Sequence, residues 1–301
     1  MDEFASARLV GVVRRGLAVA GIETTAPPAR GALLPLSAKR RYLAGIAREH
    51  GLLPLLRVGA VLPELAADPA VSALSRTDSP ADLVERWRRL ERFTHSRHRV
   101  EVAGRGVDEL DLTHVGPPGS PPEPAEDAVV LGVLVALLGL IGVRGVGVTA
   151  GEVEVCVSGE FVAPLPESGS ARWHVTWTST AAPDPVILGE QDVVAAARGL
   201  LGADLARRWT VDELAGRLGT SRRGLQRRLR EAGGFQDMLG TARTEAAAGL
   251  LLGGAHSLST IGFACGYTDQ PHFTRDFTRR TAMTPSAYRG AFGASHKIKP
   301  R

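Results

Sequence analysis

The sequence predicts an α+β protein with two domains: a mixed α/β amino-terminal domain over residues 1–185 and an all-α carboxy-terminal domain over residues 186–301. The length of 301 residues suffices for two domains that each bury a core. The charge is divided unequally. From residue 203 onward there are 16 Lys and Arg against 8 Asp and Glu, whereas the remainder holds 20 against 24. Finally, a helix–turn–helix pattern occurs twice between residues 210 and 289.

The amino-terminal domain is expected to mix helices with strands. Glycine follows two segments with helical spacing, and Ser79 followed by Pro80 is typical of a helix start. Alternating apolar residues predict strands. In chain order we expect helices over 4–20, 37–50 and from Pro80 onward, a hairpin over 100–112, a proline-rich connector over 116–125, a buried helix over 129–143, and strands over 153–157 and 173–177.

The first copy of the helix–turn–helix pattern spans residues 210–229. Thr210 and Glu213 have the spacing of a capping box, which defines the start of a short helix. Gly219 can take the left-handed conformation that ends this helix. Ser221 then serves as the N-cap of a second helix over about residues 222–231.

The second copy spans residues 257–277 and repeats this order. A buried pair four residues apart marks one face of the second helix in each copy, because positions i and i+4 lie on the same side of a helix. In the second copy the two N-caps, the ending glycine and the buried pair are Ser257 and Thr268, Gly266, and Phe273 with Phe277. In the first copy the buried pair is Leu225 with Leu229.

A helical segment over residues 235–252 connects the two copies. At 1.5 Å per residue it is about 27 Å long. A connector of this length can hold the second helices of the two copies about 34 Å apart, which is one turn of DNA.

The faces opposite the buried pairs carry side chains that recognise DNA bases. Arg pairs bidentately with guanine edges and Gln with adenine edges. For His272 an ordinary surface position is the alternative, and Arg279 can equally contact phosphate. The candidate DNA-binding residues are Arg222, Arg223, Gln226 and Arg227 in the first copy, and Gln270, His272, Arg275 and Arg279 in the second.

Three motifs, at residues 225–229, 266–277 and 284–289, carry a family resemblance. With them, residues 186–292 resemble the DNA-binding domain of AraC/XylS-type bacterial transcription regulators. The resemblance implies an effector-sensing or dimerising amino-terminal domain. Gly249 and Gly262 depart from the family's pattern and lower helix propensity by up to about 1 kcal/mol each. The base-reading positions that it implies are Arg223, Gln226, Arg227, Gln270, His272 and Arg275.

These observations predict a cytoplasmic, sequence-specific transcription regulator controlled by a small-molecule effector that binds the amino-terminal domain. The expected partners are double-stranded DNA, the effector, a second copy of the chain as a homodimer, and RNA polymerase if the protein is an activator. The alternative is a small-molecule-binding or catalytic amino-terminal domain with a carboxy-terminal domain that binds DNA only non-specifically. The effector, the operator and the direction of regulation stay open.

Neither an enzyme nor a cofactor is expected. The sequence holds no Gly-x-Ser-x-Gly motif, phosphate loop or dinucleotide fingerprint. His95 and His98, with Asp111 and His114, have a spacing that can bind zinc. Such spacing is common by chance, so hydrogen-bonded or surface histidines are expected and no metal is assigned.

The two cysteines, Cys156 and Cys265, lie in different predicted domains. This placement argues against a disulfide framework and fits a reducing cytoplasm. The longest apolar run, residues 129–143, is too short for a membrane span. Trp173 and Trp177 share one face of a strand and are expected in the core, with a ligand pocket as the alternative.

Overall fold

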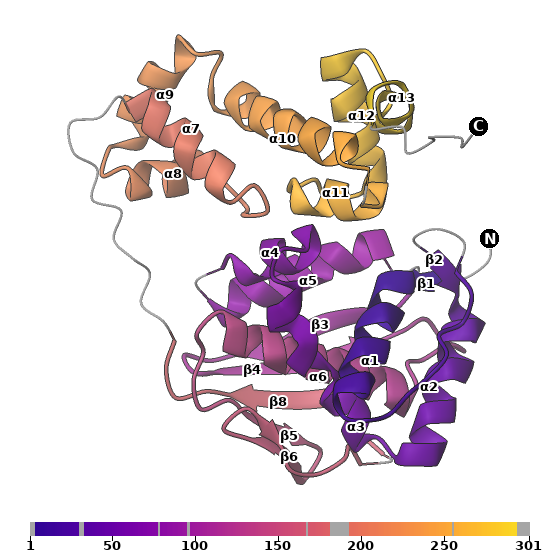
Figure 1. Cartoon of the computed structure of the whole chain (residues 1–301). Coiled ribbons are helices and arrows are strands. Elements are labelled where there is room, and N and C mark those ends of the chain that lie inside the picture. Colours follow the sequence, from indigo (N-terminus) through magenta and orange to yellow (C-terminus); the bar gives the residue numbers. More distant parts are fainter. Residues whose placement is uncertain are drawn as a thin grey trace, which may run out of the picture. The chain divides into compact units, whose positions relative to one another are not determined.

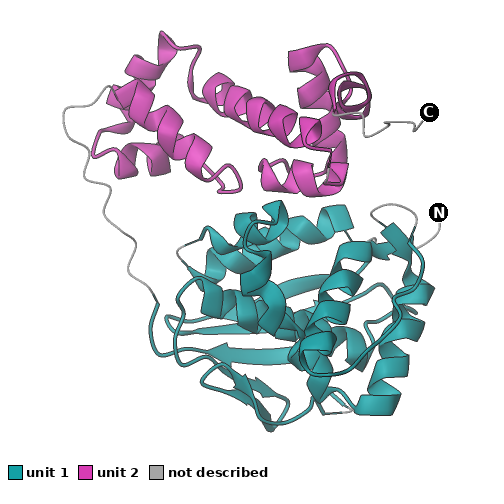
Figure 2. Ribbon diagram, viewed as in Figure 1, with its two compact units in different colours: residues 1–182 teal, residues 183–301 magenta. Residues whose placement is uncertain are grey.

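The computed structural model describes residues 4–29, 33–77, 79–94, 97–166, 168–180, 193–254 and 256–293. The chain forms two compact units, Met1–Ala182 (unit 1) and Pro183–Arg301 (unit 2), as Figure 2 shows. Unit 1 combines a sheet with helices and the described part of unit 2 is helical (Figure 1), so the chain has the predicted α+β fold. The division between the units and the predicted boundary at residue 185 both fall in residues 181–192, which lie outside the described residues. Within the described ranges, no helix is both long and apolar enough to cross a bilayer.

A six-stranded antiparallel sheet forms one layer of unit 1, with the strand order β3-β4-β8-β5-β6-β7. The predicted hairpin is β3–β4. Trp173 and Trp177 are buried, as expected for core residues. The strands are β3 Arg99–Arg105, β4 Glu109–Val115, β5 Gly147–Ala150, β6 Val153–Val157, β7 Glu160–Phe161 and β8 Arg172–Thr176.

Helices cover this sheet (Figure 1). The first helix was predicted from Phe4 but begins at Ala7, because Phe4–Ser6 (β1) pairs antiparallel with Leu33–Pro35 (β2). The helices of unit 1 are α1 Ala7–Val19, α2 Leu36–His50, α3 Leu53–Leu56, the 3-10 helix η1 Val58–Leu65, α4 Pro69–Ser75, α5 Pro80–Thr94 and α6 Pro124–Leu140.

Helix α6 is the central buried helix of unit 1. It was predicted over residues 129–143 but begins earlier, at Pro124, where the side chains of Glu123 and Glu126 form a capping box. A Cβ on Gly132 would lie 2.1 Å from the carbonyl oxygen of Leu56. The glycine therefore lets the backbones of α6 and α3 meet directly.

Seven helices make up the described part of unit 2, and α10 has the predicted bounds. Its position between the two helix–turn–helix copies is visible in Figure 1. The helices are α7 Val193–Ala203, α8 Val211–Arg217, α9 Arg222–Arg230, α10 Phe235–Leu252, α11 Leu258–Ala264, α12 Gln270–Thr281 and α13 Pro285–Phe292.

One predicted cap is wrong. Thr268 was expected to cap α12, but Asp269 occupies the N-cap and its Oδ1 accepts a hydrogen bond from the His272 amide at 2.7 Å. The helix therefore begins one residue later than Thr268 would allow, and Pro271 stands in its first turn, where a missing amide hydrogen is tolerated.

Candidate nucleic-acid interface

The turns that flank α9 determine its direction. Ser221 caps the helix, because its Oγ accepts a hydrogen bond from the Gly224 amide at 3.1 Å. Gly219, in the turn before α9, has a φ of +59°, and Gly233 and Gly234 after it have φ values of +86° and +88°. Residues other than glycine rarely adopt positive φ values, because their Cβ atoms clash with the backbone. The local sequence thus defines both ends of the helix, as predicted.

The inner face of α9 packs into the core of unit 2 through Leu225 and Leu229, which are fully buried. Burial of each leucine contributes about 1.5–3 kcal/mol relative to exposure. The apolar cluster around them draws on α7, α8 and the start of α10, and contains Ala197, Leu201, Trp209, Leu214, Ala215, Leu218, Phe235, Met238 and Leu239.

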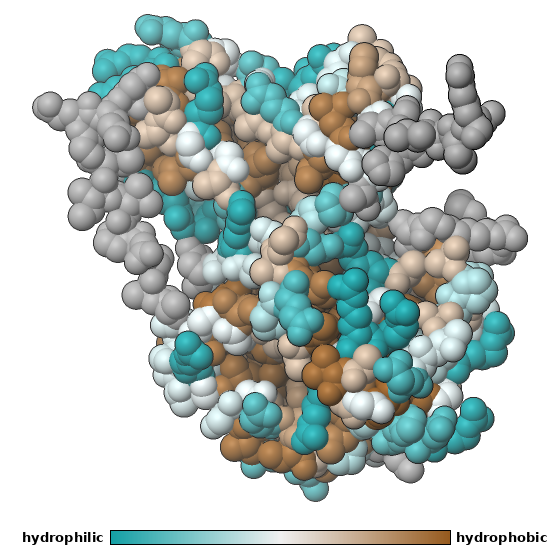
Figure 3. Space-filling model, in the orientation of Figure 1, coloured by the Kyte–Doolittle hydropathy of each residue, from teal (hydrophilic) through white to brown (hydrophobic). Residues whose placement is uncertain are grey.

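The outer face of α9 is basic. Five of its nine residues are arginines, and like charges at this density repel one another, so a polyanion is a favourable partner. Arg222 pairs with Asp212 of α8 at 2.7 Å, but both side chains are exposed and such a pair adds little stability. Figure 3 shows hydrophilic side chains over the end of unit 2 that holds α9. The exposed side chains are Arg222, Arg223, Gln226, Arg227, Arg228 and Arg230.

Aromatic side chains position α12. Phe273 and Phe277 are fully buried, as predicted. Ring centroids lie 5.0 Å apart between Tyr267 and Phe273, 5.7 Å between Phe273 and Phe277, and 5.4 Å between Phe277 and Tyr288. Such pairs contribute about 0.5–1.5 kcal/mol each beyond the area they bury. Tyr288 belongs to α13, so the last predicted motif closes the core of the second copy.

The candidate residues of α12 differ in exposure. Arg275 and Arg279 are exposed, and Arg279 donates a hydrogen bond to Asp276 at 2.5 Å. Burial by itself raises the pKa of Asp276, but the hydrogen bond from Arg279 and the charges of Arg279 and Arg280 lower it below its ordinary value.

Two further candidates, Gln270 and His272, are half-buried although they were expected to point outward. Oε1 of Gln270 is buried. The His272 ring lies edge-on to Tyr267 at 5.3 Å, and its Nδ1 accepts a hydrogen bond from the Thr268 amide at 3.3 Å. For His272 the reason is the start of α12, where Tyr267 and Thr268 of the turn that follows α11 contact its ring.

The second copy packs against the segment before the first copy and against α10. A Cβ on Gly266, whose φ is +77°, would lie 1.8 Å from the carbonyl oxygen of Leu205, which lies between α7 and α8. The guanidinium of Arg243 on α10 lies 5.8 Å from the ring centroid of Tyr267 in the second copy. The glycine that ends α11 therefore also permits close approach of the second copy to the backbone at Leu205.

Arg280 was not among the predicted residues, although the sequence held a signal for it. Positions 273, 277 and 280 lie on one helical face, so Arg280 continues the apolar face of α12. Its side chain is only 16% exposed, and it pairs with Asp237 of α10 at 3.0 Å.

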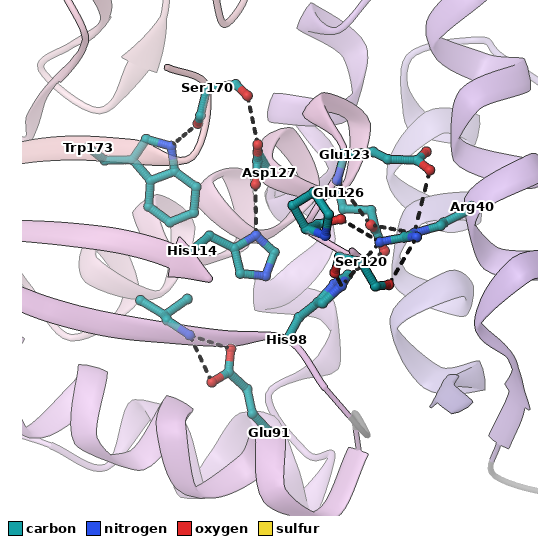
Figure 4. A network of polar contacts seen from close by, with 12 residues as sticks. Arg40, Glu91, His98, His114, Ser120, Glu123, Glu126, Asp127, Ser170 and Trp173 are labelled. Carbon is teal, nitrogen blue, oxygen red and sulfur yellow. Dashed lines mark hydrogen bonds and ion pairs between the residues drawn. The ribbon is translucent and has the colours of Figure 1, made fainter. Parts of the chain in front are cut away.

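Unit 1 buries a second group of polar side chains around the amino end of α6 (Figure 4). The Glu126 carboxylate forms ion pairs with two basic side chains: its Oε1 lies 2.6 Å from Lys39 Nζ and its Oε2 lies 3.0 Å from Arg40 Nε. Burial raises the pKa of Glu126, but the charge and hydrogen bond of Lys39 lower it below its ordinary value. His98 Nε2 lies 3.2 Å from NH2 of Arg40. Burial lowers the pKa of His98 to about 4.

The residues with zinc-like spacing are only partly brought together in the fold: the ring centroids of His98 and His114 lie 5.6 Å apart, but each ring has its own polar partners. His98 belongs to the group around Glu126, and His114 Nδ1 lies 2.8 Å from Oδ1 of Asp127, whose Oδ2 accepts a hydrogen bond from Ser170 at 2.7 Å (Figure 4). Asp111 pairs with His174. His95 lies outside the described residues.

Comparison with known proteins identifies one domain. A family model described as a helix-turn-helix domain matches residues 214–291. The solved DNA-binding domain of AdpA, in complex with a target DNA, is 28% identical over 34% of this chain and 94% of that chain, with a TM-score of 0.32. A transcriptional regulator with an AraC-type DNA-binding domain from Chromobacterium violaceum is 27% identical over 34% and 94%, with a TM-score of 0.32. CdpR from Pseudomonas aeruginosa is 17% identical over 93% and 97%, with a TM-score of 0.35.

The residues that the family model matches run from α8 to α13 and include both helix–turn–helix copies with the connecting helix α10. They also contain the three motifs on which the resemblance rests. The carboxy-terminal unit therefore holds a helix-turn-helix domain, and over that part the chain is similar to the DNA-binding domains of AraC-type transcription regulators.

Proposed function

We propose that this regulator binds specific DNA sequences by inserting α9 and α12 into neighbouring major grooves. The observation that carries the proposal is the duplication of a capped helix with a buried pair on one face and arginines on the other. The 18 residues of α10 connect the two copies, a length of about 27 Å. Together with the turns that flank α10, this length suits two recognition helices about 34 Å apart.

The proposed roles follow from exposure and chemistry. Arginine and glutamine side chains on an exposed helix face can reach base edges, and arginine can also contact phosphate. The proposed base-reading residues are Arg223, Gln226 and Arg227 on α9, and Gln270, His272 and Arg275 on α12. Arg222 and Arg279 are proposed to contact phosphate or bases at the edges of the site. Gln270 and His272 are half-buried, so their side chains must turn outward to reach base edges.

Selection of bound oligonucleotides from a random pool tests sequence specificity directly. With the enriched site in hand, Gln226→Ala or Arg227→Ala should cost about 1–3 kcal/mol of discrimination at one base pair. Arg228→Ala is the matched control, because this arginine is exposed on the same helix but lies to the side of the proposed contacts. It should weaken binding to all sequences alike. Equal losses on specific and random DNA for Arg227→Ala would contradict the assignment.

We also propose that unit 1 binds a small-molecule effector. The support is its separate sheet, its own core and the polar side chains buried around α6, which are unusual in a purely structural domain. A thermal-shift screen of the full chain against metabolites and zinc tests this. A ligand that raises the melting temperature and changes operator affinity supports effector control. If ligands leave both quantities unchanged, the proposal fails.

The resemblance further supports a cytoplasmic homodimer without enzymatic activity that contacts RNA polymerase if it is an activator. Sedimentation with and without operator DNA tests the dimer. The alternative, a domain that binds DNA only non-specifically, predicts diffuse genomic footprints, whereas a sequence-specific regulator gives discrete ones.

A further inference from the structure

The Arg280 side chain bridges two helices of unit 2. Its NH1 donates hydrogen bonds to Asp237 Oδ1 at 3.0 Å and to Thr241 Oγ1 at 3.4 Å, both on α10. Its Nε lies 3.4 Å from Asp276 Oδ1 on its own helix, one turn earlier. Arg280 therefore joins α12 to α10 through charged contacts at the edge of the aromatic core.

The surface of α10 is shaped to receive this guanidinium. A Cβ on Gly240 would lie 2.1 Å from NH2, 2.4 Å from Cζ and 2.7 Å from Nε of Arg280. Gly240 is buried, and the guanidinium occupies the space that a side chain at this position would fill. Glycine in a helix interior lowers helix stability by about 1 kcal/mol relative to alanine. The space that the Arg280 guanidinium needs over position 240 explains the glycine there.

The contact has a consequence for the direction of α12. The aromatic pairs hold one face of α12 against the core, and the contacts of Arg280 with Asp237 and Thr241 add directional links between α12 and α10. Since Arg280 follows the base-reading candidates on the same helix, a rotation of α12 about its axis moves all of them together.

We propose that Arg280 is a positioning residue for the second recognition helix: seated over Gly240 and paired with Asp237 and Asp276, it sets the angle at which α12 presents Gln270, His272 and Arg275 to DNA. The inference rests on the proposed sequence-specific function. It distinguishes Arg280 from the exposed arginines of both recognition helices, because Arg280 acts on DNA through α12 and does not touch it.

Gly240→Ala tests the proposal without removing any charge. The three atoms nearest to the new methyl group all belong to the far end of the flexible Arg280 side chain. The variant should therefore fold while the guanidinium moves away from position 240. The matched control is Gly249→Ala on the same helix, where a Cβ meets nothing within 4 Å. Asp237→Asn, at a side chain that is 57% exposed, removes the partner charge with no cost in packing.

The measurement is the affinity of the full chain for the selected operator and its single-base variants. The bases read by each helix are assigned with Arg227→Ala for α9 and the double variant Gln270→Ala/Arg275→Ala for α12. Gly240→Ala and Asp237→Asn should lower discrimination among the α12 bases by about fivefold or more. Discrimination among the α9 bases should change less than twofold, and Gly249→Ala should alter neither.

Other outcomes contradict the proposal in distinguishable ways. Unchanged discrimination in Gly240→Ala and Asp237→Asn overturns the positioning role while leaving the proposed function intact. Equal loss for both sets of bases indicates general destabilisation and likewise overturns it. A wild-type chain that enriches no sequence from the random pool contradicts the proposed function itself, and the positioning role with it.

Discussion

The Glu91 carboxylate lies in the interior of unit 1, where it accepts hydrogen bonds from the Trp87 indole at 2.8 Å and from the Val100 amide at 3.0 Å. Despite these donors, burial raises the pKa of Glu91 to about 8. The folded state therefore binds a proton at Glu91 at pH values where the unfolded chain has released it.

This shift predicts a pH dependence of stability. The pKa of Glu91 is higher in the folded state than in the unfolded chain. The stabilisation from the proton bound at Glu91 is therefore fully present below pH about 4.5 and is lost as pH rises toward about 8. Stability of unit 1 should fall by about 1.4 kcal/mol per pH unit in this window. Glu91→Gln should flatten the dependence in calorimetric melting between pH 5 and 8, and the exposed Glu101→Gln should retain it. A Glu91→Gln profile parallel to that of the wild type would contradict the prediction.

Arginine has two roles in unit 2, and the helical face decides between them. Arg227 follows the buried Leu225 by two positions and is exposed, whereas Arg280 follows Phe277 by three and Phe273 by seven and is largely covered. The same charged group can therefore meet DNA in one position and stabilise a helix pair in another.

At the scale of elements, the start of α12 depends on one side chain. Asp269 Oδ1 accepts the hydrogen bond from the His272 amide, while Thr268 is exposed one residue earlier. A negative charge at a helix N-terminus also interacts favourably with the helix dipole.

Loss of this cap should destabilise unit 2. Asp269→Ala should lower the free energy of unfolding by about 1 kcal/mol, the usual value of an N-cap, and Thr268→Ala should lower it by less. Urea unfolding of a fragment with residues 193–301 measures both. If the two variants lose the same stability, the assignment of Asp269 as the cap is wrong.

At the scale of the whole molecule, the charge division matches the two units. The basic residues concentrate in the unit with the helix-turn-helix domain, and the remainder of the chain is net acidic. Because DNA is a polyanion, the basic unit 2 should contact it, and the acidic unit 1 should not.

The salt dependence of DNA binding measures this electrostatic contribution. If about six phosphates are neutralised, log affinity against log salt concentration should have a slope of about −5. Binding titrations between low and physiological salt give the slope. A slope near zero would show that the arginines of α9 and α12 do not contact the phosphate backbone.

Unit 2 should also act alone. Its described helices enclose their own apolar cluster around Leu225 and Leu229 and an aromatic core around Phe273. A fragment of residues 193–301 should fold and retain the base discrimination of the full chain, although affinity falls if dimerisation requires unit 1. Circular dichroism and operator titration check both points, and loss of discrimination in a folded fragment would contradict independence.

The sequence alone determined the two helices of each copy, their glycine turns, the bounds of α10 and both buried pairs, whereas α7 and α13 were not predicted. These features depend on residues a few positions apart: Ser221 caps α9 because its oxygen reaches an amide three residues later, and positive φ at Gly219 needs only a missing Cβ. The prediction at Thr268 was wrong because Asp269, one residue later, offers a better acceptor.

Only the tertiary structure decided what depends on contacts between distant segments. The strand at Phe4–Ser6 exists because residues 33–35 pair with it. Gly240 and Arg280 are 40 positions apart, so no local pattern places the guanidinium over the glycine. The grouping of Lys39, His98 and Glu126 likewise follows from packing of α2 and the sheet against α6. Local steric and capping preferences act within a turn of chain, whereas burial of charge depends on which surfaces the whole core brings together.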